Sequence, residues 1–372
     1  LEKKKTLIKK MKICHITTVH KPSDVRIFHK QCCSLQRNGF SVELIAPNVK
    51  KKSLKGIKLI GLNPTKKNRL YRIFKLSKDA YDLALESNAD IYHFHDPELL
   101  RIGLKLIGKG KKVIYDVHED LPRQILTKHW INPFLRKTIS FLIEKYENYA
   151  ARKMSAVIGA TSHITQRFIK INNQSININN FPIISEFKDL NSKKSINHIV
   201  YSGGISKQRG IVEIIKAIEN SEIKLLLAGE FLDPSLEKEL NALKGWGNVN
   251  YLGFLNRSEI SSLYQKANIG MVTLHPTLSY KDSLPVKMFE YMAAGIPIIA
   301  SDFEKWKEII INHNCGMTVN PNDSIEIKKA IDYLISNPFE AKKMGENGIK
   351  AVKEIYNWSI EEKKLLALYR TL

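Results

Sequence analysis

The sequence predicts an α/β protein with two Rossmann-like domains, each built on a doubly wound parallel sheet. Three observations support this. The 372 residues exceed one ordinary α/β core and suit two. Short apolar runs alternate with helical stretches from end to end. A stretch rich in Asn and Ser interrupts this alternation near the middle, and 43% hydrophobic residues are enough to bury a core on either side of it.

The strand candidates of the first half are rich in Ile and Val and are continuous rather than alternating, which is typical of parallel strands buried on both faces. They are Lys12–Thr17, Ser41–Ala46, Ile57–Ile60, Asp90–His95, Lys112–Asp116 and Ala156–Ala160. Helices are expected between them, for example at Val25–Asn38, Leu70–Ser87, Pro97–Gly108 and Asn132–Met154. This order predicts parallel strands joined by helical crossovers.

Asn172–Asn197 has no amphipathic period, and we interpret it as the linker between the domains. Strands are then predicted at His198–Ser202, Lys224–Ala228, Asn248–Leu252, Ile269–Thr273 and Pro297–Ala300. Helices are predicted at Arg209–Glu219, Pro234–Leu243, Ser258–Lys266, Val286–Ala294, Ser324–Ser336, Pro338–Ile355 and Ser359–Arg370. The expected domains span 11–185 and 196–355, and a ligand is expected in a cleft between them.

The net charge of +22 is concentrated in the first half of the chain. Residues 1–190 hold 36 Lys and Arg against 16 Asp and Glu, whereas residues 191–372 hold 23 against 21. An AT-rich genome accounts for much Lys but not for this asymmetry, which suggests an anionic partner such as a membrane surface or a nucleic acid. No helix-turn-helix, zinc or RNA-recognition signature supports a specific nucleic-acid partner. The sequence contains no run of eighteen or more apolar residues, so no helix is expected to span a membrane.

The cysteines exclude two further classes of protein. Only Cys14, Cys32, Cys33 and Cys315 are present, and no Cys-x-x-Cys pair occurs. Neither a zinc site nor a disulfide framework is supported, and we expect reduced cysteines in a cytoplasmic protein without a metal.

The most informative segment runs from Asp282 to Ser301, DSLPVKMFEYMAAGIPIIAS. Lys287 lies where a helix is expected to begin, and a helix N-terminus offers free N–H groups and a partial positive charge to a diphosphate. Glu290 follows three residues later and can accept hydrogen bonds from a ribose diol. An ordinary amphipathic helix ended by Gly295 is the alternative interpretation.

This acidic-x7-Glu pattern, continued by Tyr-Met-Ala-Ala-Gly-x-Pro, resembles that of the family 4 retaining glycosyltransferases with the GT-B fold, including those of bacterial surface-polysaccharide synthesis. The resemblance covers about residues 11–370. It implies that Glu290 binds the ribose, Lys287 the diphosphate and Asp282 the donor sugar, with Leu284 and Pro285 beside them. Because Asp282 stands where Glu is better known, the donor sugar stays open. The fold also implies that the last helix, about 358–372, packs back on the first domain.

A second segment, Gly203-Gly204-Ile-Ser-Lys-Gln-Arg209-Gly210, follows a predicted strand. Glycines let a backbone approach a phosphate closely, and Arg can bind a diphosphate through two hydrogen bonds. The family usually has Gly-Arg here and Lys-Gly five residues later, so Gly204 replaces the Arg and Arg209 takes the later cationic position. A structural strand-to-helix turn is the alternative.

Two segments of the first half supply candidates near the reacting groups. His95 ends a strand, and the resemblance implies contact with the donor sugar near the reacting carbon; a core histidine is the alternative. His118 and Glu119 follow the next strand and are expected on the acceptor side, unless they are simple caps. Asp24-x-Arg26 replaces the usual Gly-Gly loop: Asp24 is expected to cap a helix, and Arg26 to face the acceptor.

The segment from Lys128 to Lys145 mixes aromatic, aliphatic and basic residues. It suits a helix lying on an anionic bilayer, and it also suits a core helix with long cationic side chains, which the helix alone slightly favours. The charge of the first half shifts the expectation toward peripheral contact with the inner membrane.

The resemblance implies a metal-independent, retaining transferase whose leaving phosphate takes the proton of the acceptor. His95, Asp282, Lys287 and Arg209 are its predicted catalytic residues. The substrates are a UDP- or GDP-linked sugar and a glycan acceptor, expected on a polyprenyl diphosphate for capsule, O-antigen or another envelope glycan, and no cofactor is expected. The alternatives are a nucleotide-sugar 2-epimerase on the same fold and a basic nucleic-acid-binding protein.

Overall fold

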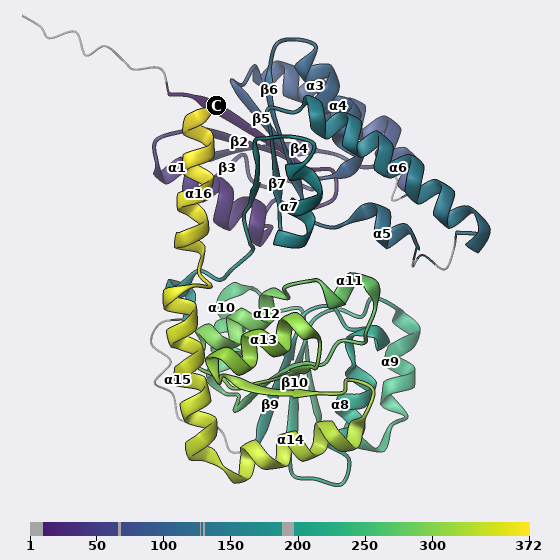
Figure 1. The fold of residues 1–372 in the computed structure, drawn as a ribbon, viewed down its shortest axis with the longest axis vertical. Helices are drawn as coiled ribbons and strands as arrows, with labels where there is room; N and C mark the ends of the chain where they lie inside the picture. Colours follow the sequence, from purple (N-terminus) through teal and green to yellow (C-terminus); the bar gives the residue numbers. More distant parts are fainter. Residues whose placement is uncertain (1–9, 66–67, 127, 129–130, 188–196) are drawn as a thin grey trace, which may run out of the picture. The chain divides into compact units, whose positions relative to one another are not determined.

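The computed structural model describes residues 10–65, 68–126, 128, 131–187 and 197–372. Unit 1 comprises residues 1–180 together with 361–372, and unit 2 comprises 181–360. The prediction of two α/β domains with parallel sheets is confirmed, and helices cover both faces of each sheet (Figure 1).

Unit 1 contains an eight-stranded sheet in the order β3-β4-β2-β1-β5-β6-β7-β8, and all of its pairings are parallel except β3 with β4. Its strands are β1 (Lys12–Ile16), β2 (Ser41–Pro47), β3 (Ser53–Leu54), β4 (Ile57–Leu62), β5 (Ile91–Phe94), β6 (Lys112–Val117), β7 (Ala156–Gly159) and β8 (Ser175–Asn177). The strand order reverses between β1 and β5, which is where open α/β sheets bind ligands.

The helices of unit 1 follow the predicted crossovers, with local differences. They are η1 (Val25–Cys32), α1 (Cys33–Arg37), α2 (Arg69–Tyr71), η2 (Arg72–Leu76), α3 (Ser77–Ser87), η3 (Pro97–Leu99), α4 (Leu100–Ile107), α5 (Leu121–Leu126), α6 (Pro133–Lys153) and α7 (Ser162–Ile169). The predicted helix Val25–Asn38 begins with the π-helical segment η1. Asp24 caps it, because its carboxylate accepts the backbone N–H of Ile27.

The two faces of the unit 1 sheet differ in chemistry. One face packs Tyr92, Phe94 and Tyr115 into an apolar core beneath α3, α4, α6 and α7. The opposite face carries His15 and His93, which are paired in register on β1 and β5, and Asp116 on β6. Since alternate residues of a strand point to opposite faces, this polar cluster is a consequence of the strand register.

α6 is more exposed than the core interpretation, which the helix alone slightly favours, would predict. Asn132 caps it, and the buried residues of the helix are Ser140, Glu147, Ala150 and Ala151. Its exposed large side chains are Phe134, which is 91% exposed, Leu135, Phe141, Leu142, Tyr146 and Tyr149. They recur at helical spacing, so the helix turns an apolar stripe outward. His129 and Trp130, which belong to the same predicted segment, lie outside the described residues.

Unit 2 contains a six-stranded parallel sheet in the order β11-β10-β9-β12-β13-β14. The strands are β9 (His198–Ser202), β10 (Lys224–Ala228), β11 (Val249–Gly253), β12 (Ile269–Val272), β13 (Ile298–Ser301) and β14 (Gly316–Val319). In order of sequence this is 3-2-1-4-5-6, the arrangement of dinucleotide-binding folds, with its reversal between β9 and β12. Alternate residues of β9 enter two different apolar clusters: Val200 joins one, and Ile199 and Tyr201 join the other.

The helices of unit 2 are η4 (Ile184–Phe187), η5 (Lys207–Arg209), α8 (Ile211–Ala217), α9 (Pro234–Asn241), η6 (Lys244–Asn248), α10 (Arg257–Gln265), α11 (Leu278–Lys281), α12 (Val286–Ala293), α13 (Glu304–His313), α14 (Ser324–Ser336) and α15 (Pro338–Glu354). The final helix α16 (Trp358–Thr371) belongs to unit 1 from Glu361 onward. There the Glu361 carboxylate accepts the backbone N–H of Asn179, and Leu365, Leu368 and Tyr369 are buried.

The predicted linker Asn172–Asn197 is only partly irregular. It contains β8, which pairs with the edge strand β7, and η4; residues 188–196 lie outside the described residues. β8 was missed because an edge strand of Ser, Ile and Asn has no apolar run. The short β3, the edge strand β14 and helices α5, α7, α11 and α13 were also absent from the predicted elements.

A close backbone approach between α15 and the turn after α12 gives a stability test. A Cβ added at Gly345 would lie 2.3 Å from the carbonyl oxygen of Gly295. We expect Gly345→Ala to lower the free energy of unfolding by about 1–3 kcal/mol through overpacking. Gly247→Ala, which would meet no atom within 4 Å, is the matched control. Denaturant unfolding that gives equal values for both variants would contradict this packing.

Candidate functional site

The strongest sequence motif lies at the carboxyl end of the unit 2 sheet. β12 leads through α11 to α12, and Pro285 precedes the first residue of α12. Gly295, with φ of +66°, follows the helix and permits the turn into β13. Lys287 lies in the first turn of α12 and Glu290 one turn later, so both side chains project from one side of the helix.

Lys287 and Arg209 form a pair of cations beside the glycine turn that follows β9. A Cβ added at Gly203 would lie 3.3 Å from Lys287 Nζ and 3.6 Å from Arg209 Nη1, and one at Gly204 would lie 3.2 Å from Arg209 Nη1. Gly203 has φ of +121°, which L side chains rarely adopt. Because Gly203 and Gly204 have no side chains, the backbone of the turn lies close to Lys287 and Arg209. This place is where the strand order of the sheet reverses.

Neither cation contacts a carboxylate within ion-pair distance in the described part of the chain. Lys287 Nζ is buried without a hydrogen-bond partner and lies 3.5 Å from the centre of the Tyr201 ring. The Arg209 guanidinium donates to the Gly204 carbonyl oxygen at 3.3 Å, and its Nε has no partner. Burial, together with the Arg209 charge, lowers the pKa of Lys287 well below its ordinary value. This arrangement can stabilise an anion with more than one charged oxygen.

Glu290 is buried and held by two neighbours. Its Oε1 accepts from Arg257 Nη1 at 2.5 Å, and its Oε2 accepts from the Tyr264 hydroxyl at 3.2 Å. Arg257 also contacts the Glu186 carboxylate. Burial and the Glu290 carboxylate raise the pKa of Tyr264 well above its ordinary value, so Tyr264 stays a hydrogen-bond donor. A carboxylate has about four acceptor sites, and those that remain suit hydroxyl donors.

The other predicted donor-site residues border this group. Asp282 follows α11, is partly exposed, and its carboxylate accepts from Lys305 Nζ at 2.6 Å. Leu284 packs against the apolar core of unit 2. The loop between Asp282 and Pro285 is fixed by Trp306, whose indole N–H donates to the Ser283 carbonyl oxygen at 2.7 Å.

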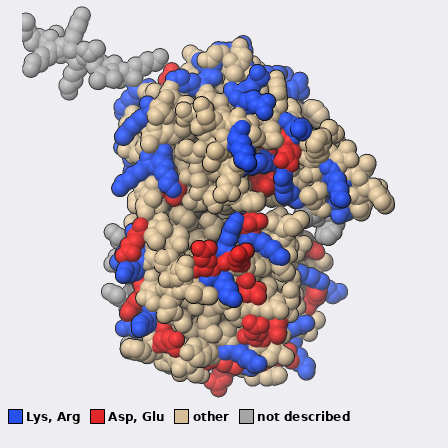
Figure 2. Space-filling view, in the orientation of Figure 1, with Lys and Arg blue, Asp and Glu red and all other residues tan. Residues whose placement is uncertain are grey.

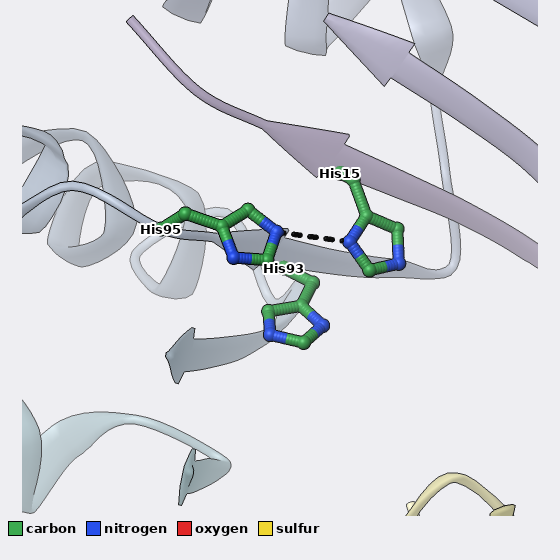
Figure 3. A group of neighbouring side chains, drawn as sticks. All are labelled: His15, His93 and His95. Atoms are coloured by element: carbon green, nitrogen blue, oxygen red, sulfur yellow. Dashed lines mark hydrogen bonds between the residues drawn. The ribbon is translucent and has the colours of Figure 1, made fainter. Parts of the chain in front are cut away.

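In unit 1, His95 belongs to a buried group of three imidazoles with His15 and His93 (Figure 3). His95 Nε2 lies 3.0 Å from His15 Nδ1, and the rings of His93 and His95 are stacked at 4.6 Å. His93 Nδ1 lies 2.7 Å from the Tyr369 hydroxyl on α16. Burial lowers the pKa of all three imidazoles, to about 3 for His95, so they are neutral near pH 7.

Asp116 joins the predicted residues of unit 1 to one another. Arg26 binds its carboxylate through Nε at 3.0 Å and Nη2 at 2.7 Å, and Gln31 donates to it at 2.8 Å. His95 Nδ1 and His118 Nε2 each lie 3.1 Å from Asp116 Oδ2. Arg26 is itself buried, so any influence it has on a substrate acts through Asp116.

His118 is the partly exposed imidazole of this group, with 17% of its side chain accessible. Glu119 lies next to it and contacts the Gln124 amide. His20 lies nearby, with its ring 5.1 Å from that of His118 and its Nδ1 3.4 Å from the Asp24 carboxylate. The loop after β1 and the loop after β6 therefore place hydrogen-bonding groups at the carboxyl edge of the sheet.

Two groups in unit 1 have metal-ligand spacing: His15 with His93 and His95, and His95 with Asp116 and His118. In the first group His15 Nδ1 and His95 Nε2 lie at hydrogen-bond distance from each other, 3.0 Å, and His93 Nδ1 lies 2.7 Å from the Tyr369 hydroxyl. In the second group Arg26 already neutralises the carboxylate.

The structure thus assembles the predicted residues in two sets. Gly203, Gly204, Arg209 and Lys287 lie together in unit 2, and Arg26, His95 and His118 meet at Asp116 in unit 1. Tyr201, Arg257 and Tyr264 were not predicted, because their roles depend on tertiary contacts. Asp116 was visible as an acidic residue at a strand end, and only the fold shows that four side chains converge on it.

Comparison with known protein families yields two matches that together span most of the chain. Residues 183–351 match the family described as "Glycosyl transferases group 1", and residues 25–178 match "Glycosyltransferase Family 4". An uncharacterized glycosyltransferase of Methanocaldococcus jannaschii is 26% identical over 309 residues, which are 80% of this chain and 77% of that protein.

Solved structures with the same fold include sucrose-phosphate synthase of Thermosynechococcus elongatus, with a TM-score of 0.76 and 18% identity over 97% of this chain and 99% of that one. The Anabaena protein HepE in complex with UDP-glucose has a TM-score of 0.72 at 15% identity, over 97% of this chain and 100% of that one.

The lowered pKa of Lys287 predicts that anion binding takes up a proton. A bound diphosphate raises the pKa of Lys287, because its negative charge favours the protonated amine. The affinity for the diphosphate should therefore fall by up to about tenfold per pH unit as the pH rises from the pKa of Lys287 in the free protein to its higher pKa in the complex. Calorimetry with a nucleoside diphosphate in buffers of different ionisation enthalpy measures this uptake. Lys287→Met should abolish it and Lys307→Met should not. Equal uptake in both variants would show that another group takes up the proton.

Proposed function

This chain belongs to family 4 of the glycosyltransferases, which are retaining and metal-independent, and on that premise we propose that it moves a hexosyl group from a UDP- or GDP-linked sugar to a lipid-linked glycan. The observation that carries the donor assignment is the pair of basic side chains, Lys287 and Arg209, held at the glycine turn of unit 2 with no carboxylate at ion-pair distance among the residues that the structure describes. A nucleoside diphosphate supplies the missing negative charge.

The remaining donor contacts follow from the positions of the side chains. The ribose diol binds Glu290, whose orientation Arg257 and Tyr264 fix. The sugar of the donor lies toward Asp282, Leu284 and Pro285 of unit 2. UDP is the first donor nucleotide to test, because the structure of the similar protein HepE was solved in complex with UDP-glucose.

In the proposed reaction the acceptor hydroxyl attacks the anomeric carbon on the face that the diphosphate leaves. The bond between the anomeric carbon and the phosphate oxygen breaks, the bond to the acceptor oxygen forms, and the leaving phosphate takes the proton of the acceptor. Lys287, Arg209 and the N-terminus of α12 stabilise the charge that develops on the diphosphate. This reaction requires no side-chain nucleophile.

The acceptor proposal rests on the chemistry of unit 1. Its sequence holds 38 Lys and Arg against 16 Asp and Glu, whereas unit 2 holds 21 of each. Lys and Arg predominate on the visible surface of unit 1, while both signs mingle on unit 2 (Figure 2). The outward stripe of α6 adds Phe134, Phe141 and Leu142 to this charge. Basic and apolar groups together suit an anionic bilayer.

No helix within the described ranges is long and apolar enough to cross a membrane. From the basic and apolar surface of unit 1, we propose that the protein is a peripheral enzyme at the cytoplasmic face of the membrane, acting on a polyprenyl-diphosphate-linked saccharide in the synthesis of capsule, O-antigen or a related envelope glycan.

The donor site is tested by substitution of its two motif residues. Lys287→Ala and Glu290→Ala should each lower transfer by at least about 10²-fold, because each removes a contact to the leaving nucleotide. Thermal unfolding should still show a folded protein, and Lys307→Ala is the matched control. Release of the nucleotide and the configuration of the product are the readouts. Retained activity in either variant would contradict the site, and conversion of the sugar without an acceptor would identify an epimerase.

The membrane proposal is tested by flotation with vesicles. We expect binding to vesicles that contain phosphatidylglycerol and little binding to neutral ones, with weaker binding as salt rises. The double variant Phe141→Asp and Leu142→Asp should float several-fold less, because both side chains are exposed on α6. Ile311→Asp, which changes an equally exposed apolar residue of unit 2, is the control. Equal flotation of all proteins would exclude α6 as the contact.

A further inference from the structure

Glu186 lies on the short helix η4, in the segment that the sequence predicts as a linker, and its side chain belongs to the surroundings of the donor helix. Its carboxylate accepts from Arg257 Nη2. Arg257 Nη1 donates to Glu290 Oε1 at 2.5 Å, so one guanidinium bridges two carboxylates. Burial disfavours the charge of Arg257, but the Glu290 and Glu186 carboxylates raise its pKa above its ordinary value, and the guanidinium stays charged.

The segment around Glu186 is fixed to α10 by further contacts. The Ser261 hydroxyl donates to the Glu186 carbonyl oxygen at 2.6 Å. The Phe187 ring lies against the guanidinium, with its centre 5.9 Å from Arg257 Cζ and 6.0 Å from the centre of the Tyr264 ring. Backbone and side-chain contacts thus hold η4 in the position from which Glu186 binds Arg257.

Glu290 keeps acceptor sites for a ligand. A carboxylate has about four such sites. Arg257 occupies one on Oε1, and the Tyr264 hydroxyl, at 3.2 Å, occupies one on Oε2. Within the described residues no other group donates to Glu290, so each oxygen keeps an acceptor site. Two such sites on one carboxylate match two adjacent hydroxyls, which is the arrangement in the diol of a ribose.

The guanidinium determines whether those two sites stay together. The Glu290 side chain is 7% accessible, and an unpaired carboxylate that is buried to this degree is unfavourable. Without Arg257, Glu290 would turn toward water or another donor, and its oxygens would no longer be presented as a pair. Without the Glu186 carboxylate, Arg257 would lose one of its two anchors and could rotate away from Glu290.

We propose that Glu186 is a positioning residue of the donor site: it holds Arg257 against Glu290, so that Glu290 accepts from both hydroxyls of a ribose and the site selects ribonucleotides over 2′-deoxyribonucleotides. This inference rests on the proposed transferase function and deepens it, because it specifies the pentose of the donor nucleotide. A 2′-deoxyribose has one hydroxyl fewer and leaves an acceptor site of the buried carboxylate unsatisfied. Donors built on deoxynucleotides are then poor substrates.

A structural bridge is the competing interpretation of the same contacts. It would join η4, α10 and α12 and stabilise unit 2 without any effect on which nucleotide binds. The two interpretations differ in the ratio of the affinities for a ribonucleotide and its 2′-deoxy form, because a loss of packing weakens both nucleotides alike. The ratio, rather than either affinity, is therefore the measurement that decides.

The ratio is measured by titration calorimetry without metal, with UDP, 2′-deoxy-UDP, GDP and 2′-deoxy-GDP. For the base that the wild-type protein binds, we expect the deoxynucleotide to bind at least about tenfold more weakly, the effect of one lost hydrogen bond to a charged group. In Arg257→Met the two affinities should become nearly equal. Glu186→Gln, which keeps the shape of the side chain but not its charge, should lower the ratio several-fold.

Two controls separate positioning from loss of the fold. Inorganic pyrophosphate has no ribose, so its affinity should be nearly the same in the wild type, Arg257→Met and Glu186→Gln. Lys328→Met, which breaks an exposed ion pair with Asp332 on α14, should keep the ribose preference of the wild type. Arg257→Lys keeps the charge but not the planar fork and should recover only part of the preference; it takes the place of Arg257→Met if that variant does not fold.

The outcomes distinguish this inference from the proposed function. A wild-type protein that binds UDP or GDP without preferring ribose, or a preference that survives in both Arg257→Met and Glu186→Gln, would overturn this inference and leave the transferase proposal standing. Loss of pyrophosphate binding together with nucleotide binding in both variants would overturn it in favour of the structural bridge. A wild-type protein that binds no nucleotide would overturn the transferase proposal, and this inference with it.

Discussion

The burial of two basic side chains, Lys287 and Arg209, with no carboxylate at ion-pair distance among the described residues is the constraint on which the donor site depends. Removing Lys287 from water is unfavourable, and its lowered pKa expresses this cost. The surrounding fold maintains the arrangement: Tyr201 lies beneath the ammonium group, the Gly203–Gly204 turn provides space, and α12 begins at Pro285. Such a site is incomplete until an anion binds, which is how a protein can bind a diphosphate strongly without a metal ion.

Unit 1 differs from unit 2 in the sign of its buried charge and in how that charge is satisfied. Its buried charge is a carboxylate, Asp116, and several donors satisfy it. Removing any one of these donors would leave the buried carboxylate with an unsatisfied acceptor site in a medium of low dielectric constant. The contributions of the donors to stability are therefore coupled. Both arrangements lie where the strand order of a sheet reverses, after β9 and β12 in unit 2 and after β1 and β5 in unit 1. In both units, the sheet determines where the site lies, and the loops at the carboxyl ends of the strands carry many of its functional side chains.

The sequence was sufficient for the elements that have strong local signals. Continuous apolar runs gave β9 and β10 residue for residue, and the pattern around Lys287 and Glu290 identified the donor helix. Weak strands at the sheet edges, β3, β8 and β14, were missed because pairing rather than local composition forms them. The pattern of α6 left a core and a peripheral interpretation open, since an amphipathic pattern does not say which face of a helix is covered. The convergence on Asp116 depends on strand register and on η1, so it required the fold.

The donor site is completed when a diphosphate binds to Lys287 and Arg209 at the Gly203–Gly204 turn. Titration calorimetry without metal, comparing UDP and GDP with UMP, GMP and the two nucleosides, tests it most directly. We expect one diphosphate to bind much more tightly than its monophosphate, the nucleoside to bind weakest, and the advantage of the diphosphate to disappear in Lys287→Met. Equal affinity for a nucleoside and its diphosphate, or an advantage that survives this substitution, would contradict it.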